Sequence, residues 1–144
     1  MRKINWGVIG LGNIAQKFLG SFSEVHNSNL LAISSNDNLK LEQNKKKFGI
    51  KNEFAFKSYE KLIQCDEVDI VYISLPNSMH FYWINKCIEN KKKFLIEKPA
   101  TLNLNEAEIL KKNVENENLF FAEGFMYRYD PLIKKVIDLI ENNE

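Results

Sequence analysis

The 144-residue sequence lacks the features that mark several specialised classes of protein. Its two cysteines, Cys65 and Cys87, have neither CxxC nor zinc-type spacing, so we expect reduced thiols, no disulfide framework and no metal site. No apolar run approaches the ~20 residues of a membrane helix, and the stretch after the first three residues is too short for a signal peptide. We therefore expect a cytoplasmic protein with no membrane partner.

The sequence also lacks an excess of charge of one sign. It has 20 Lys and Arg and 19 Asp and Glu, which gives a net charge of +1. Lysines cluster at residues 45–47 and 91–93, in each case at or just beyond the end of an expected helix, where cations suit the helix dipole. We interpret both clusters as solvated surface and expect no nucleic-acid partner. The sequence shows no repeat, low-complexity linker or internal domain boundary, and its length fits one domain with a real core.

The sequence does contain an alternation of short apolar runs and longer amphipathic segments. The apolar runs predict strands at residues 4–9, 30–34, 54–56, 68–74, 93–96 and 119–122. Apolar residues at helical spacing predict helices at residues 14–25, 38–48, 78–89 and 105–116, and a short one at 59–64. Ser58 and Asn103 are expected N-caps, with Glu106 completing a capping box. This alternation is typical of a Rossmann-type α/β fold, a doubly wound parallel sheet with helices on both faces.

The last segment, residues 129–143, predicts one more helix, with Pro131 in its first turn. Its apolar positions form a stripe that must be buried against something; they are Leu132, Ile133, Val136, Ile137 and Ile140. Two partners fit this stripe. The helix either folds back on the sheet or pairs with another chain, which would make it the contact of a homo-oligomer.

A glycine turn, Gly10-Leu11-Gly12-Asn13-Ile14-Ala15, follows the first predicted strand and opens the first predicted helix. Gly10 allows a tight turn, Gly12 lets the backbone approach a pyrophosphate, and Ala15 keeps the helix close to the strand. The helix that begins at Asn13 and Ile14 offers free N–H groups to phosphates. A strand before and a helix after this pattern predict a dinucleotide site, with a glycine-rich turn that binds no ligand as the alternative. A P-loop is excluded because no Gly-Lys-Ser/Thr follows.

The end of the second predicted strand bears on the choice between NADP and NAD. NAD sites usually place Asp or Glu there, against the ribose 2′-hydroxyl, whereas this chain has Ser34, Ser35 and Asn36. Without a carboxylate to repel a 2′-phosphate, the segment favours NADP and leaves NAD or dual use open. Lys40, one helical turn further on, either supplies a charge for that phosphate or is an ordinary surface lysine.

Two further segments follow predicted strands and should lie at the same edge of the sheet. They are Ser74-Leu75-Pro76-Asn77-Ser78-Met79-His80 and Glu97-Lys98-Pro99. Asn77 is an expected N-cap, and Pro99 could fix its turn through a cis bond. A buried glutamate beside a lysine is costly to desolvate, so this pair predicts a functional site, with a plain salt bridge as the alternative. Lys98 could hydrogen-bond a substrate hydroxyl and help to move its proton.

Together these segments resemble the N-terminal half of the Gfo/Idh/MocA (glucose–fructose oxidoreductase/inositol dehydrogenase) family. The segment from Ser74 is similar to the family's Thr-Pro-Asn-x-x-His loop, with Leu75 in place of threonine, and residues 123–131 are similar to its Glu-x-x-x-x-Arg-x-x-Pro segment. The resemblance implies that Lys98 is catalytic and that Glu97 contacts the cofactor ribose. It also implies cofactor contacts from the residues of the two matching segments, Ser74, Leu75, Pro76, Asn77, His80 and Arg128. His80, in the first turn of a predicted helix, is expected to have a structural or supporting role rather than to act as a catalyst. The aromatic residues around Arg128 are expected to be core, with the lining of a pocket as the alternative.

The resemblance implies a function as well as a fold. Residues 1–124 would be the NAD(P)-binding domain, and residues 125–144 would lead toward a substrate domain that this chain lacks. The implied reaction is hydride transfer between the nicotinamide and a sugar, cyclitol or related hydroxyl or carbonyl substrate, with this chain incomplete as a catalyst alone. The alternative is a non-enzymatic dinucleotide-binding sensor or partner subunit. A methyltransferase also uses a glycine turn, but it gives no reason for Glu97-Lys98-Pro99.

Overall fold

The computed structural model describes residues 2–142 and contains one six-stranded parallel sheet in the order β3-β2-β1-β4-β5-β6. Its strands are β1 (Ile4–Ile9), β2 (Ser28–Ser34), β3 (Ala55–Phe56), β4 (Ile70–Ile73), β5 (Lys93–Ile96) and β6 (Phe121–Glu123). The predicted Rossmann-type fold is confirmed. The expected bounds of β4 were too wide because its pairing with β1 runs only from Ile70 to Ile73. The bounds of β1 and β5 agree with the sequence pattern.

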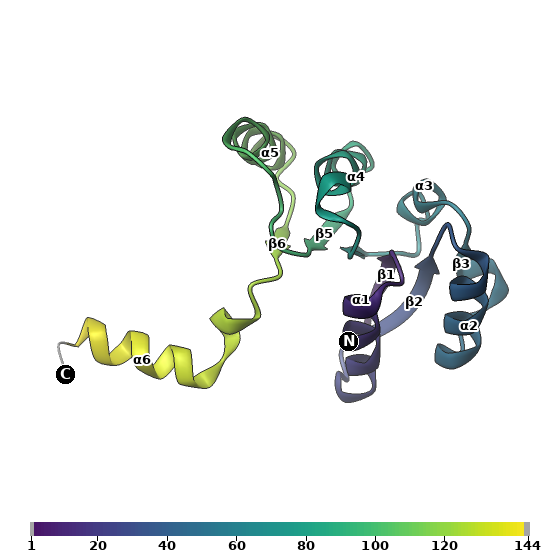
Figure 1. Cartoon of the computed structure of the whole chain (residues 1–144), viewed down its shortest axis with the longest axis horizontal. Coiled ribbons are helices and arrows are strands. Elements are labelled where there is room, and N and C mark those ends of the chain that lie inside the picture. The colour runs from purple at the N-terminus through teal and green to yellow at the C-terminus, as the bar shows by residue number, and fades with distance from the viewer. Residues whose placement is uncertain (1, 143–144) are drawn as a thin grey trace.

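Five helices cover the two faces of the sheet (Figure 1). On one face lie α1 (Asn13–Gly20) and α2 (Asn38–Phe48), and on the other lie α3 (Tyr59–Ile63), α4 (Asn77–Glu89) and α5 (Leu104–Asn116). The first helix is shorter than predicted, because it ends at Gly20 and a 3-10 turn occupies Ser21–Glu24. The Ser21 hydroxyl donates to the Phe18 carbonyl at 2.8 Å, a local bond that competes with helix continuation.

The predicted caps of α3 and α5 are confirmed. The Ser58 side chain accepts a hydrogen bond from the backbone at the start of α3, and the Asn103 side chain accepts one from the Glu106 N–H at 3.0 Å. The Glu106 carboxylate accepts from the Leu102 N–H at 2.9 Å, so the return bond of the capping box is displaced by one residue. These bonds satisfy N–H groups that the first turn of α5 leaves without helical partners.

Two apolar cores hold the layers together, one on each face of the sheet. The core beneath α3, α4 and α5 includes Ile73, Phe94 and Ile96, all fully buried. The core beneath α1 and α2 includes Val8 and Ala15, also fully buried. A small residue at position 15 therefore does let α1 pack close to β1, as predicted. The burial of this apolar surface is the main favourable term in folding.

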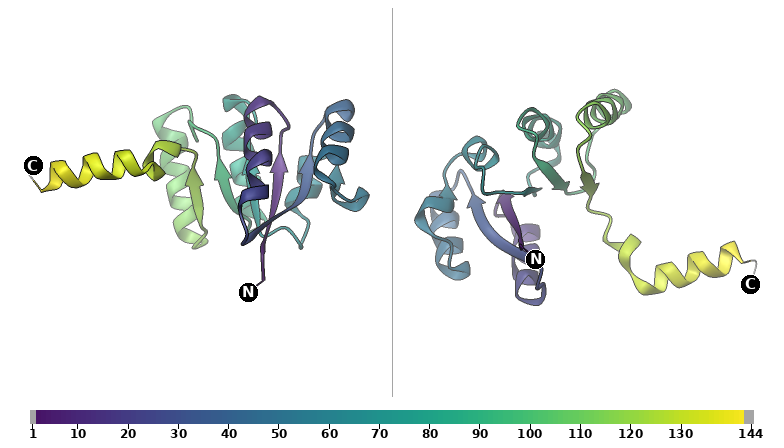
Figure 2. Two further views of the ribbon diagram at one scale, coloured as in Figure 1. Left: turned by 90° about the horizontal axis from the view of Figure 1, so that it is seen from below. Right: turned by 180° about the vertical axis from the view of Figure 1, so that it is seen from behind.

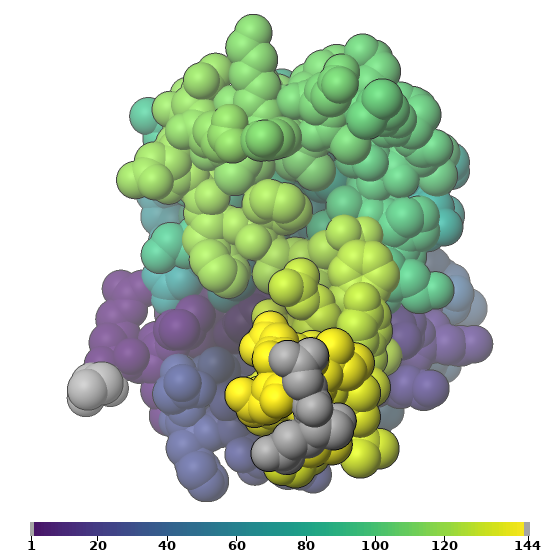
Figure 3. All heavy atoms as spheres, turned by 90° about the vertical axis from the view of Figure 1, so that its left-hand side faces the viewer, coloured from purple at the N-terminus to yellow at the C-terminus, as the bar shows by residue number. Residues whose placement is uncertain are grey.

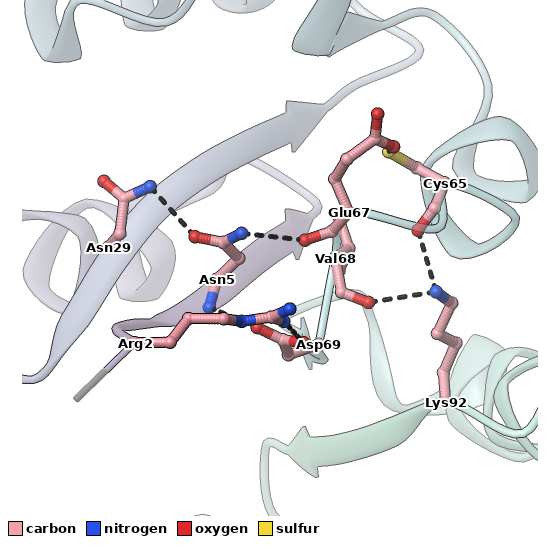
Figure 4. A network of polar contacts seen from close by, with 8 residues as sticks. All are labelled: Arg2, Asn5, Asn29, Cys65, Glu67, Val68, Asp69 and Lys92. Atoms are coloured by element: carbon pink, nitrogen blue, oxygen red, sulfur yellow. Dashed lines mark hydrogen bonds and ion pairs between the residues drawn. The ribbon is translucent and has the colours of Figure 1, made fainter.

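A polar network crosses the amino-terminal edge of the sheet (Figure 4). Asp69, just before β4, accepts hydrogen bonds from the Asn5 N–H at 2.8 Å and from the Arg2 guanidinium. Burial by itself would raise the pKa of Asp69, but these hydrogen bonds outweigh it and hold the pKa below its ordinary value. Lys92 donates to the carbonyls of Cys65 and Val68 at 2.7 and 2.9 Å. Both cysteines are free thiols, as predicted.

The helix α6 (Pro131–Glu141) extends away from the sheet (Figures 1 and 2). Figure 3 looks at this side of the molecule, with α6 in yellow facing the viewer. Leu132 and Ile140 are each 69% exposed, so the first alternative, a stripe folded back onto the sheet, is wrong for residues 2–142. Pairing with another chain stays a prediction.

The bounds of this last helix also differ from the prediction. It begins at Pro131 because the Asp130 carboxylate caps it, accepting from the Leu132 N–H at 2.8 Å. The preceding residues, Met126–Tyr129, form a separate 3-10 turn. The predicted end at Asn143 lies outside the residues that the structure describes. Among residues 2–142, none of the helices has both the length and the apolar character needed to span a bilayer.

Candidate functional site

The predicted site segments follow the carboxyl ends of their strands, on both sides of the junction between β1 and β4. The strand order reverses at this junction, and ligands of open α/β sheets bind at such a switch point. Backbone hydrogen bonds continue past the strand ends and keep the loops in register. The Gly10 N–H donates to the Ser34 carbonyl, and the Ser74 N–H donates to the Ile9 carbonyl, each at 3.1 Å.

The two glycines of the turn have different physical reasons to be glycine. Gly10 has φ +85°, and a Cβ there would lie 2.8 Å from both the Ser74 carbonyl oxygen and a Leu75 methyl. The fold itself therefore requires glycine at this position. Gly12 has φ −75°, which any residue adopts, and a Cβ there would meet nothing within 4 Å. Its missing side chain leaves open space beside the backbone, which fits the close approach of a phosphate.

The N-terminus of α1 suits an anion. Gly12 is the N-cap, no side chain caps the helix, and its first turn carries no acidic residue. Asn13 is exposed, and Ile14 lines a neighbouring cavity. The free N–H groups and the positive end of the helix dipole are therefore available to a pyrophosphate.

The turn after β2 uses its serine hydroxyls internally. Ser34 is fully buried and donates to the Phe56 carbonyl at 2.8 Å. Ser35 is 4% exposed and its hydroxyl accepts from the Asp37 N–H at 3.1 Å. Asn36 is exposed and lies at the tip of the turn. Of the three predicted residues here, Asn36 is the one whose side chain is accessible to a ligand.

The carboxylate nearest this turn is committed to the cap of α2. One oxygen of Asp37 accepts from the N–H groups of Leu39 and Lys40, at 2.9 and 3.1 Å. The Lys40 ammonium lies 3.9 Å from the other oxygen. Lys40 also lines a hollow of about 310 Å³ together with Leu11 of the glycine turn. Lys40 therefore brings a positive charge both to this hollow and to the neighbourhood of Asp37.

The loop after β4 packs against the glycine turn. The Ser74 hydroxyl lies 2.9 Å from the Gly10 carbonyl oxygen and is buried with Leu75, whereas Pro76 and Asn77 are exposed. Asn77 is the first residue of α4 rather than its N-cap. Pro76 holds the cap position and makes no side-chain hydrogen bond, because proline has no polar side-chain atom.

The Glu97–Lys98 pair differs from the prediction. Glu97 is half-buried and accepts a hydrogen bond from the Tyr72 hydroxyl, while Lys98 is exposed. Burial and the Glu97 carboxylate both raise the pKa of Tyr72. The expected burial of the pair is wrong for Lys98, which is exposed. Among residues 2–142 no ion pair joins Glu97 to Lys98, so the alternative of a plain salt bridge is wrong as well.

The turn after Lys98 has the cis Lys98–Pro99 bond considered from the sequence, and two other elements contact it. His80 in α4 is fully buried, with Nδ1 2.7 Å from the Pro99 carbonyl oxygen and Nε2 2.8 Å from the Leu75 carbonyl oxygen. Glu123, at the end of β6, accepts from the Ala100 N–H at 2.8 Å. The two segments expected near the nicotinamide are therefore in direct contact through His80.

Sequence reasoning gave Tyr72 no part in the site, and it placed Glu123 in the family-like segment 123–131 without giving it a role. Tyr72 had a detectable signal, because it is the one polar side chain within the strand Ile70–Ile73. Glu123 pairs in register with Ile96 at the end of β5. That register brings Glu123 beside the turn after Glu97. The register of β5 and β6 could not be predicted from the sequence.

A cavity of about 380 Å³ lies beside Glu97, on the sheet face that α1 partly covers. Its walls come from α1, β4, β5 and the segment after β6, and include Phe18, Tyr72, Glu97, Phe125 and Tyr129. The aromatic segment around Arg128 is therefore not core, since Tyr127 and Tyr129 are 58% and 71% exposed. Arg128 is itself exposed and lines a separate hollow with Glu123.

Comparison with known proteins agrees with this geometry. The Gfo/Idh/MocA family model, described as "Oxidoreductase family, NAD-binding Rossmann fold", matches residues 4–125. The D-xylose 1-dehydrogenase (NADP(+)) 2 of Haloferax volcanii is 30% identical over 94% of this chain and 41% of its own length. The myo-inositol 2-dehydrogenase of Thermotoga maritima is 30% identical over 94% of this chain and 40% of its own length.

A solved structure gives the same result. KijD10, a 3-ketoreductase from Actinomadura kijaniata, in complex with NADP and TDP-benzene, superposes with a TM-score of 0.89 at 29% identity. The superposition covers 98% of this chain and 43% of KijD10. The chain thus spans about two fifths of the length of the relatives it matches.

Proposed function

The chain belongs to the Gfo/Idh/MocA oxidoreductase family, and on this premise we propose that it holds the nicotinamide dinucleotide of a dehydrogenase. The observation that carries the proposal is Gly12. Neither its backbone conformation nor its neighbours require glycine, yet it faces open space at the uncapped N-terminus of α1. A bound pyrophosphate is a direct physical reason for that combination.

We propose NADP as the preferred cofactor, with NAD as the weaker ligand. The turn after β2 offers the exposed amide of Asn36, and Asp37 is occupied by the cap of α2. Lys40 stands beside the hollow next to Leu11 and would attract a 2′-phosphate. In support, the Haloferax relative is named as an NADP(+) enzyme, and KijD10 was solved in complex with NADP.

The proposed reaction is hydride transfer to or from a sugar, cyclitol or related polyol. A bound nicotinamide supplies the hydride chemistry. Lys98, exposed at the end of β5, would donate a hydrogen bond from its Nζ to the substrate oxygen and hold or release the proton there. Glu97, fixed by Tyr72, would face the cofactor ribose. We propose that residues 1–124 bind the cofactor, while residues 125–144 lead to a domain that contacts the substrate.

The test of cofactor binding is a fluorescence titration of the chain with NADPH and with NADH. We expect saturable binding that is tighter for NADPH, and loss of both in Gly12→Asp, whose carboxylate would occupy the phosphate position. Gly20→Asp is the matched control, because Gly20 also faces open space but lies at the other end of α1. No saturable binding by a chain shown to be folded would contradict the proposal, as would equal loss in both variants.

A further inference from the structure

One peptide unit beside Lys98 is held at both of its polar ends. The carbonyl oxygen of Pro99 and the N–H of Ala100 belong to this same Pro99–Ala100 peptide unit. Nδ1 of His80 lies 2.7 Å from that oxygen, and the Glu123 carboxylate accepts from that N–H at 2.8 Å. Two residues from distant parts of the chain, one in α4 and one in β6, therefore fix the orientation of the peptide plane.

The two contacts match the dipole of the Pro99–Ala100 peptide unit. A carboxylate faces the positive N–H end, and a nitrogen of the imidazole ring faces the negative carbonyl end. The bond to the carboxylate is charge-assisted and therefore stronger than a bond between neutral groups. Because both His80 and Ala100 are buried, water competes weakly with these contacts.

His80 also reaches the loop after β4. Its Nε2 lies 2.8 Å from the Leu75 carbonyl oxygen, so the ring spans the loop after β4 and the turn after β5. A carbonyl oxygen only accepts hydrogen bonds, so each contact needs a proton on the facing nitrogen. A neutral ring can make one of the two bonds, and a ring protonated on both nitrogens can make both.

We propose that His80 and Glu123 are positioning residues, which set the location of Lys98 relative to the loop that receives the nicotinamide. The proposal rests on the dinucleotide site proposed above. Pro99 follows Lys98 directly and has a fixed φ, so an oriented Pro99–Ala100 peptide unit leaves the Lys98 backbone little freedom. The His80 ring also lies against the Leu75 carbonyl oxygen. It therefore sets the distance between the turn after β5, which carries Lys98, and the loop after β4.

The test compares two probes that differ only in the nicotinamide end of the cofactor. NADPH spans the whole site, whereas 2′-phospho-ADP-ribose lacks the nicotinamide. We expect His80→Phe to weaken NADPH binding about fivefold to tenfold, the effect of one lost hydrogen bond, and to leave the affinity for 2′-phospho-ADP-ribose unchanged. His26→Phe is the matched control, because His26 is exposed and is the other histidine of the chain.

Glu123 gives a second pair of variants, which keeps the test decisive if His80→Phe fails to fold. Glu123→Gln retains an oxygen that can accept from the Ala100 N–H, and it should bind NADPH closer to the wild type than Glu123→Leu does, with the affinity for 2′-phospho-ADP-ribose unchanged. Glu123→Leu removes that acceptor and should weaken NADPH alone. Each variant is first checked for a wild-type circular dichroism spectrum.

The outcomes separate the two proposals. Equal weakening of both probes in the foldable variants would mean that these residues only support the fold, and it would overturn the inference. Unchanged NADPH affinity in Glu123→Leu and His80→Phe would overturn it as well. A folded wild-type chain that binds neither probe would overturn the proposed function, and the inference with it.

Discussion

Tyr72 donates its phenolic hydrogen to the Glu97 carboxylate, so a side chain within β4 fixes the residue that follows β5. Tyr72 is 2% exposed and packs with the core beneath α1, while Glu97 lies at the rim of the neighbouring cavity. A core residue, Tyr72, therefore determines the orientation of the Glu97 carboxylate.

Replacing Tyr72 by phenylalanine tests this relationship. The variant keeps the ring in the core but leaves Glu97 without its donor, and we expect it to lower the free energy of unfolding by about 1–2 kcal/mol. Urea unfolding followed by circular dichroism measures the change. Tyr82→Phe is the control, since Tyr82 is 53% exposed and its change should be near zero. An equal change in unfolding free energy in the two variants would show that the Tyr72–Glu97 hydrogen bond does not contribute to stability.

The two glycines of the turn should respond in opposite ways to alanine. Gly10→Ala combines a positive φ with contacts of 2.8 Å, and we expect it to cost about 2 kcal/mol or more of unfolding free energy. Gly12→Ala has no such clash and should change stability by less than about 0.5 kcal/mol while weakening NADPH binding. A Gly12→Ala variant that loses stability, beside a Gly10→Ala variant that keeps it, would show that the roles of the two glycines are wrongly assigned.

Asp69 should contribute to stability in a pH-dependent way. Its pKa is lowered in the folded chain, so its contribution is full above the ordinary carboxyl pKa of about 4 and is lost as the pH falls through the lower folded value. In Asp69→Asn, the free energy of unfolding should therefore fall less than in the wild type as the pH drops below about 4, as measured by urea unfolding at several pH values. Asp66→Asn, at an exposed neighbouring position, is the control. Identical pH profiles for Asp69→Asn and the wild type would refute this role.

Lys40 should distinguish the two dinucleotides. Lys40→Ala is expected to weaken NADPH about fivefold and NADH little, because only NADPH carries the 2′-phosphate. The difference should shrink as salt is added. Lys61→Ala removes the same charge from the exposed surface of α3 and should leave the ratio unchanged. Equal weakening of both dinucleotides by Lys40→Ala would remove the argument for NADP.

The helix α6 should be dispensable for the stability of the sheet. Ile137 is 46% exposed on the apolar stripe, and Ile137→Lys should change the free energy of unfolding by less than about 0.5 kcal/mol. Sedimentation velocity of the wild type and of the same variant tests the predicted pairing of α6 with another chain, which the lysine should abolish. A loss of more than about 1 kcal/mol in a monomeric chain would mean that the stripe packs on the sheet after all.

Local patterns in the sequence were sufficient for much of the fold. The run Ile4–Ile9, followed by Gly10, predicts a strand and a tight turn, and both follow from side-chain pattern and backbone sterics. The caps at Ser58 and Asn103 are equally local, because each depends on a bond to the backbone within three residues. Such features need no knowledge of the rest of the chain.

The features that were missed depend on distant partners. Glu123 meets Ala100 only because β6 pairs with β5 in one register, and His80 reaches Pro99 only because α4 packs beside that strand. Tyr127 and Tyr129 are exposed because the chain leaves the sheet after β6, and no local pattern distinguishes that course from a buried one.

The most direct test of the central claim, a dinucleotide across the junction of β1 and β4, is a nitrogen-15 NMR titration of the chain with NADP+. The account predicts that backbone amides of Gly12 and Asn13 shift together with those of Leu75, Asn77 and Lys98. The amides of Asn5 and Asp69, at the opposite edge of the sheet, should stay in place. Shifts confined to that opposite edge, or no shift from a folded chain at saturating cofactor, would contradict the account.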